Sequence, residues 1–469
     1  MVFASLEFLL LFLPLFLIAY AATPAAARNA TLLAGSWIFY AWWSPPYLLL
    51  LIGITALTWA GGLLIGRTVA SRARRLQLAA LIVAMVGLLA WYKYANILVE
   101  TVNLLRGWSG ALPLPWQAVV LPIGLSFIVL QAISYLVDVY RGQVVAQCSF
   151  VAFAAYKAMF GQLIAGPIIR YDWVKHEIGA AGRRFDGAGF GSGARRFMVG
   201  MSMKVLIADT LAPVADAAFG QAHPSFVDAW VGCAAYTLQL FFDFAGYSAM
   251  AIGIGAMLGF RFPENFRHPY LAHSIQDFWR RWHLSLSSWI RDYLYVPMGG
   301  NRRGAIRTYV HLILTMAIAG LWHGGDSWNY LLWGLAHGLA LAGARAFTQA
   351  GGQMPRLLAR IATLLFVMLA WTLFRAHGFE NARTMLAGQF GLQGFAPGDA
   401  MQAVFRPAHA LAFALGTVCV VMPAFAGRLQ RAAGPGLSAV AALWPVPAFL
   451  LSFALIASRG AVPFLYFQF

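Results

Sequence analysis

Charged residues are scarce in this chain of 469 residues. They make up 10% of the sequence, whereas 61% of the residues are hydrophobic. Because soluble globular domains carry roughly 25% charged residues, this composition excludes a water-soluble protein and indicates an integral membrane protein. Apolar runs recur along the whole chain and leave no stretch polar enough for a soluble domain, so we expect one membrane-embedded domain over residues 1–469.

Cysteine pairs and nucleophile motifs are also missing. The three cysteines, Cys148, Cys233 and Cys419, lie far apart, without a CxxC pair or a histidine at metal-site spacing. This pattern excludes a disulfide framework and a zinc site, and we expect neither a metal nor a bound cofactor. The chain has no Gly-x-Ser-x-Gly elbow, no P-loop and no His-Glu-x-x-His. A reaction through a covalent intermediate on the protein is therefore less favoured than a direct transfer between two bound substrates.

Acidic residues are few. The chain has 16 of them against 33 Lys and Arg, which gives a formal net charge of +17. In a soluble chain this excess would suggest a nucleic-acid partner, but here the basic residues lie mainly in short loops between apolar runs, as the positive-inside rule describes. The partner indicated is the lipid bilayer and not nucleic acid. The basic loops 67–75, 170–196 and 261–307 should be cytoplasmic, and counting helices back from the first of them puts the amino terminus outside the cytoplasm.

Apolar runs of about 20 residues predict a multi-pass, all-α membrane protein. The run Phe8 to Ala21 lacks the basic region that precedes a cleaved signal, so we expect it to remain as a first helix. Further spans are predicted near residues 30–43, 46–66, 76–98, 117–139, 197–219, 225–259, 307–322, 327–346, 357–374, 403–424 and 436–456. The prediction is thus about 11–12 transmembrane helices.

Two segments do not fit this pattern. Residues 149–169 contain two glycines and a proline. If this segment crossed the membrane, the basic loops on either side of it could not all be cytoplasmic. We therefore expect a re-entrant or interfacial element that lines a cavity. The stretch 261–307 is too polar to span and too aromatic for a solvated loop. Within it, Ile275 to Tyr295 has aromatic residues at helical spacing and is expected to form an amphipathic helix at the cytoplasmic interface.

Ionisable side chains in apolar segments are costly and are therefore candidates for function. His323 precedes a Gly-Gly pair that leaves room for a substrate, and its imidazole can act as a general base near neutral pH. The alternative is a histidine at a helix end that hydrogen-bonds a carbonyl. His283 lies between tryptophans, and it either positions a substrate group or anchors at headgroup level. His337 is a possible pocket residue.

Other charged candidates also allow two interpretations. Asp243 is flanked by aromatic residues in an apolar run, so its carboxylate must be paired, hydrogen-bonded or protonated, and structural pairing is the expected role. The pairs Arg280/Arg281 and Arg302/Arg303 either bind a phosphate-bearing donor or face anionic lipid headgroups.

Several runs resemble the membrane-bound O-acyltransferase family. They are Leu240 to Ser248, Phe262-Pro-Glu-Asn-Phe266, Asp277 to Tyr295 and Leu321-Trp-His-Gly324. The resemblance is closest to the bacterial alginate O-acetylation branch, which also shares Phe39 to Trp43, Gly124 to Phe127, Gln131 to Arg141, Gln162 to Pro167 and the closing Pro463 to Phe469. It extends over nearly the whole chain.

The resemblance implies a ring of helices around a central tunnel, in a bacterial inner membrane. It implies that His323 is the catalytic histidine and His283 the second signature histidine. Residues of the same motifs, namely Trp279, Arg280, Arg281, Trp282, Trp322, Asp243 and Tyr247, are expected to bind substrate or donor. The implied donor substrate is acetyl-CoA, and the acceptor is a hydroxyl of an exopolysaccharide such as alginate. A periplasmic or membrane-anchored acetyltransferase is the expected partner.

Three alternatives remain open at this stage. The first is D-alanyl transfer to teichoic acid from a carrier-protein thioester. The second is a proton-coupled transporter, in which Asp243, His323 and Lys204 form a relay. The third is a structural scaffold for an envelope assembly.

Overall fold

The computed structural model describes residues 1–469 except 165, 180–182, 184, 303, 426–441 and 466–469. All regular elements in the described part are helices, and no strand occurs there, which confirms the predicted all-α class. Seven helices in this part are long and apolar enough to cross a membrane: α3 (Pro45–Arg67), α4 (Ser71–Trp108), the continuous run Gly187–Phe219, α11 (Phe226–Met257), α15 (Ala305–His323), α17 (Arg356–Arg375) and Pro407–Phe425.

The helices lie close to where the apolar runs predicted them. Shorter apolar helices cover Glu7–Ala22, α5 (Leu125–Tyr140) and α23 (Pro445–Arg459). The predicted count of 11–12 spans is larger than seven because it also included shorter or more polar segments, such as α2 (Arg28–Ala41) and α16 (Asn329–Gln349). The first part of the run predicted at 436–456 lies outside the described residues.

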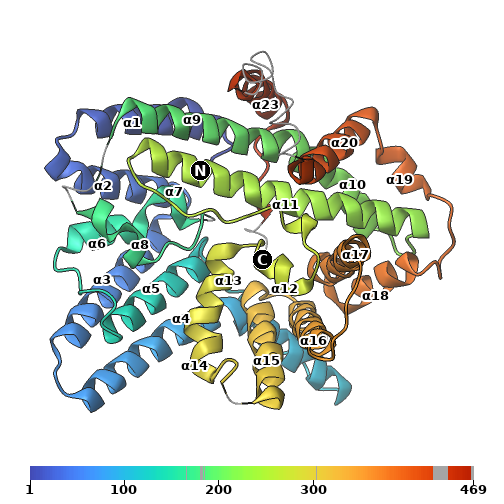
Figure 1. Cartoon of the computed structure of the whole chain (residues 1–469), viewed down its shortest axis with the longest axis horizontal. Helices are drawn as coiled ribbons and strands as arrows, with labels where there is room; N and C mark the ends of the chain where they lie inside the picture. Colours follow the sequence, from blue (N-terminus) through green and yellow to red (C-terminus); the bar gives the residue numbers. More distant parts are fainter. Residues whose placement is uncertain (165, 180–182, 184, 303, 426–441, 466–469) are drawn as a thin grey trace. The chain divides into compact units, whose positions relative to one another are not determined.

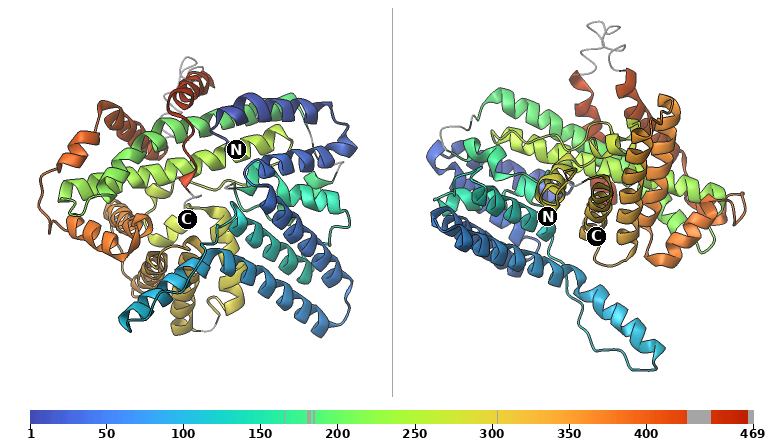
Figure 2. Two further views of the ribbon diagram at one scale, coloured as in Figure 1. Left: turned by 180° about the vertical axis from the view of Figure 1, so that it is seen from behind. Right: turned by 60° about the horizontal axis from the view of Figure 1, so that its bottom comes forward.

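The chain forms two compact units, and unit 1 comprises Met1–Phe197, Tyr247–Pro263 and Ile456–Phe467. In unit 1, α3, α4 and α5 pack against one another (Figure 1), and α2 packs on α3 and on α6 (Phe150–Ala158). The last turns of α4 extend beyond the other helices of this unit, as Figure 2 shows. Exposed apolar side chains such as Leu49 and Val83 cover its outer helices, as expected for surfaces that face lipid.

The segment 149–169 is a broken helix in unit 1. α6 ends at Ala158, and α7 (Phe160–Leu163) begins after Met159, so neither piece is long enough to span. Both pieces are almost entirely buried in protein. The hydroxyl oxygen of Ser36 accepts the backbone N–H of Phe160 at 3.1 Å, at the break in the helix. This is the kind of buried, irregular backbone that the two glycines and the proline predicted.

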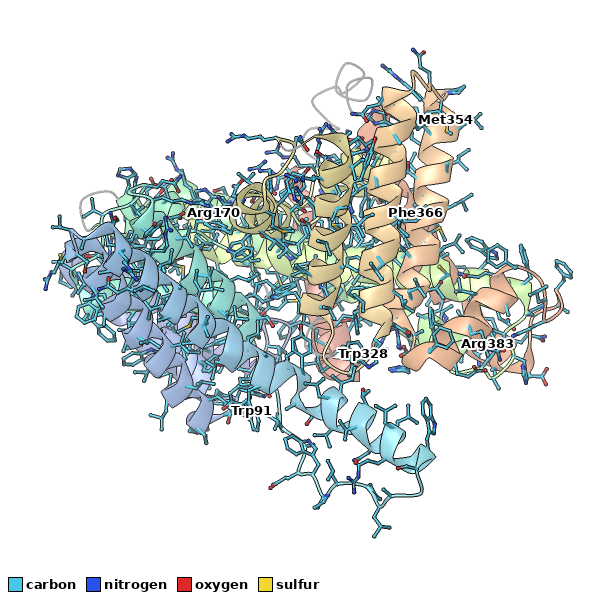
Figure 3. All side chains as sticks on the ribbon, turned by 90° about the horizontal axis from the view of Figure 1, so that it is seen from below. Trp91, Arg170, Trp328, Met354, Phe366 and Arg383 are labelled. Carbon is cyan, nitrogen blue, oxygen red and sulfur yellow. The ribbon has the colours of Figure 1, made fainter. Side chains whose placement is uncertain are left out.

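In the described part of the chain, unit 2 comprises Met198–Gly246 and Glu264–Leu455. In this unit α16 packs on both α15 and α17, and Figure 3 shows the three helices side by side, between the labelled Trp328 and Met354. Glycines set the close approach of α15 and α16. A methyl group on Gly334 would collide with the carbonyl oxygen of Met316, and one on Gly338 would lie 2.7 Å from the Cα of Ile313. Small residues four apart are typical of such tight helix contacts in membranes.

The single amphipathic helix predicted for Ile275 to Tyr295 is wrong. The structure has α12 (Ile275–Trp279), then a turn, then α13 (Leu284–Ile290) followed by a π-helical stretch Arg291–Tyr295. The break occurs because His283 adopts a left-handed backbone with φ of 44°. Asn265 holds this turn from a distant part of the chain, since its backbone carbonyl accepts Leu284 N–H and its side-chain oxygen accepts Ser285 N–H.

Candidate active site

His323 is the last residue of α15, and its side chain is buried with 6% exposed. Three aromatic rings surround the imidazole at centroid distances of 4.9 Å for Trp322, 5.3 Å for Trp333 and 5.3 Å for Phe374. The rings come from α15, α16 and α17, so the tight packing of these helices positions the imidazole. A histidine held in an aromatic cage is shielded from bulk water, which suits proton transfer to a bound substrate.

A polar pocket lies close to this cage. Its volume is about 270 Å³, and it is lined by Asp326, Ser327, Tyr330, Arg375, Ala376, His377 and Gly378. The ring of Tyr330 lies 5.0 Å from that of Phe374, which contacts His323. Gly324, directly after His323, lies against the Tyr330 ring and leaves no space for a methyl group. The pocket is thus separated from His323 by one aromatic residue.

The charges of this pocket are largely balanced. Arg375 donates from Nη2 to the Asp216 carboxylate at 2.7 Å and from Nη1 to Nε2 of His377 at 2.8 Å. A guanidinium can only donate, so Nε2 of His377 is the acceptor of this hydrogen bond. Asp326 adds a second, exposed carboxylate. The pocket therefore does not concentrate positive charge.

The structure brings Trp279 and Trp282 to the same side of unit 2 as His323. The Trp279 ring lies 5.8 Å from Trp333, a ring of the His323 cage, and 5.2 Å from His337. Trp282 lies 5.1 Å from Trp371 on α17. The broken helix 275–295 thus packs its tryptophans onto the helices that hold the candidate base.

His337 is fully buried next to the cage, with its ring 4.7 Å from that of Trp333. Its Nδ1 accepts a hydrogen bond from Nε1 of Trp279 at 3.3 Å, so the proton of the neutral ring is on Nε2. In the described part of the chain, neither Nε2 of His337 nor Nε1 of Trp333 has an acceptor. Two buried N–H donors therefore lie beside the cage without an oxygen to bind, although an unmade buried hydrogen bond is costly.

His283 lies in a different environment. Its Nδ1 donates to the side-chain oxygen of Asn265 at 3.2 Å, and its ring packs edge to face on Phe244 at 4.7 Å. Burial lowers the pKa of His283 to about 3, so the ring is neutral at physiological pH. With the proton on Nδ1, the remaining ring nitrogen is a hydrogen-bond acceptor.

Asp243 forms the ion pair that its sequence environment predicted. Lys204 is 2% exposed, and its ammonium lies 3.0 Å from an oxygen of Asp243 and 2.6 Å from an oxygen of Asp209. The three side chains form a buried charge cluster in unit 2, carried by the helical run Gly187–Phe219 and by α11. This cluster accounts for the presence of a carboxylate among aromatic residues.

The other residues expected to bind substrate or donor lie in different environments. Arg281 donates from Nε to Asp277 at 2.8 Å, whereas Arg280 is exposed. Tyr247 belongs to unit 1, where its ring stacks on Phe3 at 4.5 Å and lies 4.6 Å from Phe464.

Sequence reasoning missed several residues of this site. Trp333, Trp371 and Phe374 lie in apolar runs and carry no local signal that separates them from lipid-facing residues. Asn265 lies in the run Phe262 to Phe266. Its polar amide among aromatic residues is the one sequence feature that could have pointed to it.

Comparison with known proteins identifies the class. The profile of MBOAT, the membrane-bound O-acyltransferase family, matches residues 119–379 and so covers His283, His323 and His337. The chain belongs to the membrane-bound O-acyltransferase family: it is a multi-pass membrane protein and an O-acyltransferase.

Similar relatives come from several bacteria. The chain is 45% identical over 392 residues to the probable alginate O-acetylase AlgI of Azotobacter vinelandii, covering 83% of this chain and 78% of that protein. It is 35% identical over 428 residues to the peptidoglycan O-acetyltransferase of Helicobacter pylori, covering 82% and 79%. Similarity to the teichoic acid D-alanyltransferase of Bacillus subtilis is lower, at 25% over 289 residues, or 55% of this chain and 70% of that one.

Proposed function

We propose that this enzyme transfers an acetyl group from acetyl-CoA in the cytoplasm to a hydroxyl on the outer side of a bacterial inner membrane, for O-acetylation of an exopolysaccharide such as alginate. The observation that carries the proposal is the imidazole of His323, caged by aromatic rings and one residue away from a polar pocket. The 45% identity to an alginate O-acetylase supports the acetyl group and the polysaccharide.

The arginines before α15 and the length of α15 support the proposed direction of transfer. α15 begins directly after the arginine-rich stretch 261–307, and the positive-inside rule favours the cytoplasm for this end. Its 19 residues extend about 28 Å, close to the thickness of the hydrocarbon core. His323 and the pocket at the other end therefore face the outer side. The same rule puts the amino terminus outside.

The acceptor pocket favours a small hydroxyl-bearing group. A volume of about 270 Å³ is at the low end for ligand pockets, so it suits one side chain or sugar unit better than a polymer strand. Arg375 is already paired with Asp216, and Asp326 adds a negative charge, so a polyanion would not be attracted. These features support a periplasmic or membrane-anchored partner that receives the acetyl group and passes it to the polysaccharide.

The proposed reaction is direct transfer. His323 removes the proton of the acceptor hydroxyl while the hydroxyl oxygen attacks the carbonyl carbon of the thioester. The C–S bond then breaks, and His323 returns the proton to the leaving thiolate. In this proposal His283 holds either the acyl carbonyl or the donor. Its protonated Nδ1 is bound to Asn265, so the other ring nitrogen can only accept, which favours holding an N–H group of the donor.

The N–H groups of His337 and Trp333 are suited to stabilise the negative charge that develops on the carbonyl oxygen. Replacing His337 with Phe keeps a ring in the aromatic packing but removes the donor, and should lower kcat about 10²–10³-fold, the usual effect of losing one such donor. His337→Gln, whose amide can still donate, should keep much more activity. Turnover of the purified variants with acetyl-CoA measures both. Equal activity of His337→Phe and wild type would show that His337 does not stabilise the charge on the carbonyl oxygen.

Two measurements test the proposed function. Mass analysis of envelope polysaccharides should show O-acetyl groups in cells that contain the protein and their loss in cells without it. The purified protein should consume acetyl-CoA and not a D-alanyl carrier-protein thioester. Unchanged acetylation without the protein, or turnover of the D-alanyl donor alone, contradicts the proposal.

Peptidoglycan is the second candidate acceptor. The observation in its favour is the 35% identity over 82% of this chain to a peptidoglycan O-acetyltransferase. The same mass analysis separates the two, because acetyl groups lost from muropeptides and not from the exopolysaccharide identify peptidoglycan.

A further inference from the structure

Two arginines of unit 1 lie on one aromatic surface. The guanidinium carbons of Arg28 and Arg183 lie 5.6 Å and 5.7 Å from the centroid of the Tyr20 ring. Phe185 lies 5.0 Å from the guanidinium of Arg28, and Phe260 lies 4.9 Å from that of Arg183. These residues come from four stretches of sequence, so the arrangement is made by the fold of unit 1 and not by one helix.

Arg183 is buried, with only 7% of it exposed. Among the residues that the structure describes, it has no counter-charge, and its Nε and Nη1 have no hydrogen-bond partner. All 16 acidic residues of the chain lie in the described part, and none of the ion pairs found there includes Arg28 or Arg183. Burial lowers the pKa of Arg183, and the nearby charge of Arg28 lowers it further.

The aromatic rings alone do not compensate this burial. A guanidinium over an aromatic face gains less free energy than it loses when it is removed from water without a partner. Two like charges on the same ring add repulsion. An anion bound between the arginines would remove both costs and would accept the unpaired N–H groups.

The position of the two arginines indicates which anion. Arg28 begins α2, directly after the connection from α1 (Leu13–Ala22), and Arg183 follows α8 (Tyr171–Ile178). The side chain of Asn29 donates to the carbonyl of Ile178 at 2.9 Å and ties these two regions together. The apolar helix Glu7–Ala22 ends shortly before Arg28, and the ends of apolar helices lie at the membrane–water boundary, where lipid phosphates are concentrated.

We propose that Arg28 and Arg183 form a binding site for a phosphate group at the membrane–water boundary, with the Tyr20 ring as its base. Arginine favours phosphate because its planar N–H groups match two phosphate oxygens. The phosphate comes either from an anionic lipid headgroup or from a soluble phosphate compound. This site is independent of the proposed acetyl transfer.

Thermal unfolding of the full-length protein in dodecyl maltoside, which contains no phosphate, tests the site. Phosphatidylglycerol should raise the Tm, whereas diacylglycerol with the same chains should not, if the source is lipid. Inorganic phosphate, compared with chloride at equal ionic strength, should raise the Tm if the source is soluble. By native mass spectrometry, the ratio of phosphatidylglycerol-bound to free protein should fall about tenfold or more in Arg183→Gln and in Arg28→Gln.

The control is Arg67→Gln, which removes the same charge from an exposed position of unit 1 and should keep the wild-type response. Without phosphate or phospholipid, Arg183→Gln should unfold at the wild-type Tm or above it, because it removes an uncompensated charge. A lower Tm of this variant under those conditions, equal responses of Arg183→Gln and wild type, or no response of the wild type to either probe would overturn the proposal.

Discussion

His323→Ala is expected to lower acetyl transfer by at least about 100-fold, because a positioned general base contributes about 10²–10⁴-fold in rate. The imidazole is buried in its aromatic cage, so bulk water has poor access to replace it as a base. The measurement is the initial rate of acetyl-CoA consumption by the purified variant. The Tm of the same sample shows that the protein is folded.

A histidine on the same helix provides the matched control. His311 of α15 hydrogen-bonds the carbonyl of Gly300 at 3.0 Å through Nδ1 and is not part of the cage. His311→Gln should therefore keep turnover near that of wild type. If His323→Ala also keeps near-normal turnover while folded, His323 is not the base, and the proposed mechanism is wrong.

Lys204→Met is expected to leave little folded protein. The substitution removes the cation that is paired with both Asp209 and Asp243, and breaking a buried charge cluster in this way typically costs about 3–5 kcal/mol. The Tm and the yield of monodisperse protein in detergent measure this loss.

The triple variant Lys204→Met, Asp209→Asn, Asp243→Asn is the control, because it removes the cation together with both carboxylates. It should recover most of the folded yield and retain acetyl-CoA turnover if the cluster is structural. A folded but inactive triple variant would instead indicate that Asp243 binds the donor. Normal folding of Lys204→Met alone would contradict the assigned role of the cluster.

The helices could be predicted from the sequence because the bilayer imposes strict demands on them. A span needs about 20 apolar residues, and its backbone must satisfy its own hydrogen bonds. Thus α3, α11, α15 and α17 begin and end within a few residues of the predicted runs. The break in 275–295 could not be found in this way, because Asn265, on a different segment, holds the turn.

The candidate site was predictable only where a polar residue interrupts an apolar run. His323 and Asp243 have that signal, and the pairing expected for Asp243 is confirmed by its contact with Lys204. The identity of its partner was not readable, since Lys204 lies on another helical segment. Trp333 and Phe374 form the cage of His323 by tertiary packing alone, and an apolar residue that faces a site looks the same in sequence as one that faces lipid.

The left-handed backbone of His283 affects how this position can vary. Alanine is strained at a φ of 44°, while asparagine and glycine tolerate that region. An alanine scan would therefore combine two losses, one of the imidazole and one of the turn between α12 and α13. Asparagine keeps the turn and has a side-chain amide that can still donate to Asn265. Natural exchange at this position is thus confined to a few residue types by stereochemistry, whatever chemistry the imidazole performs.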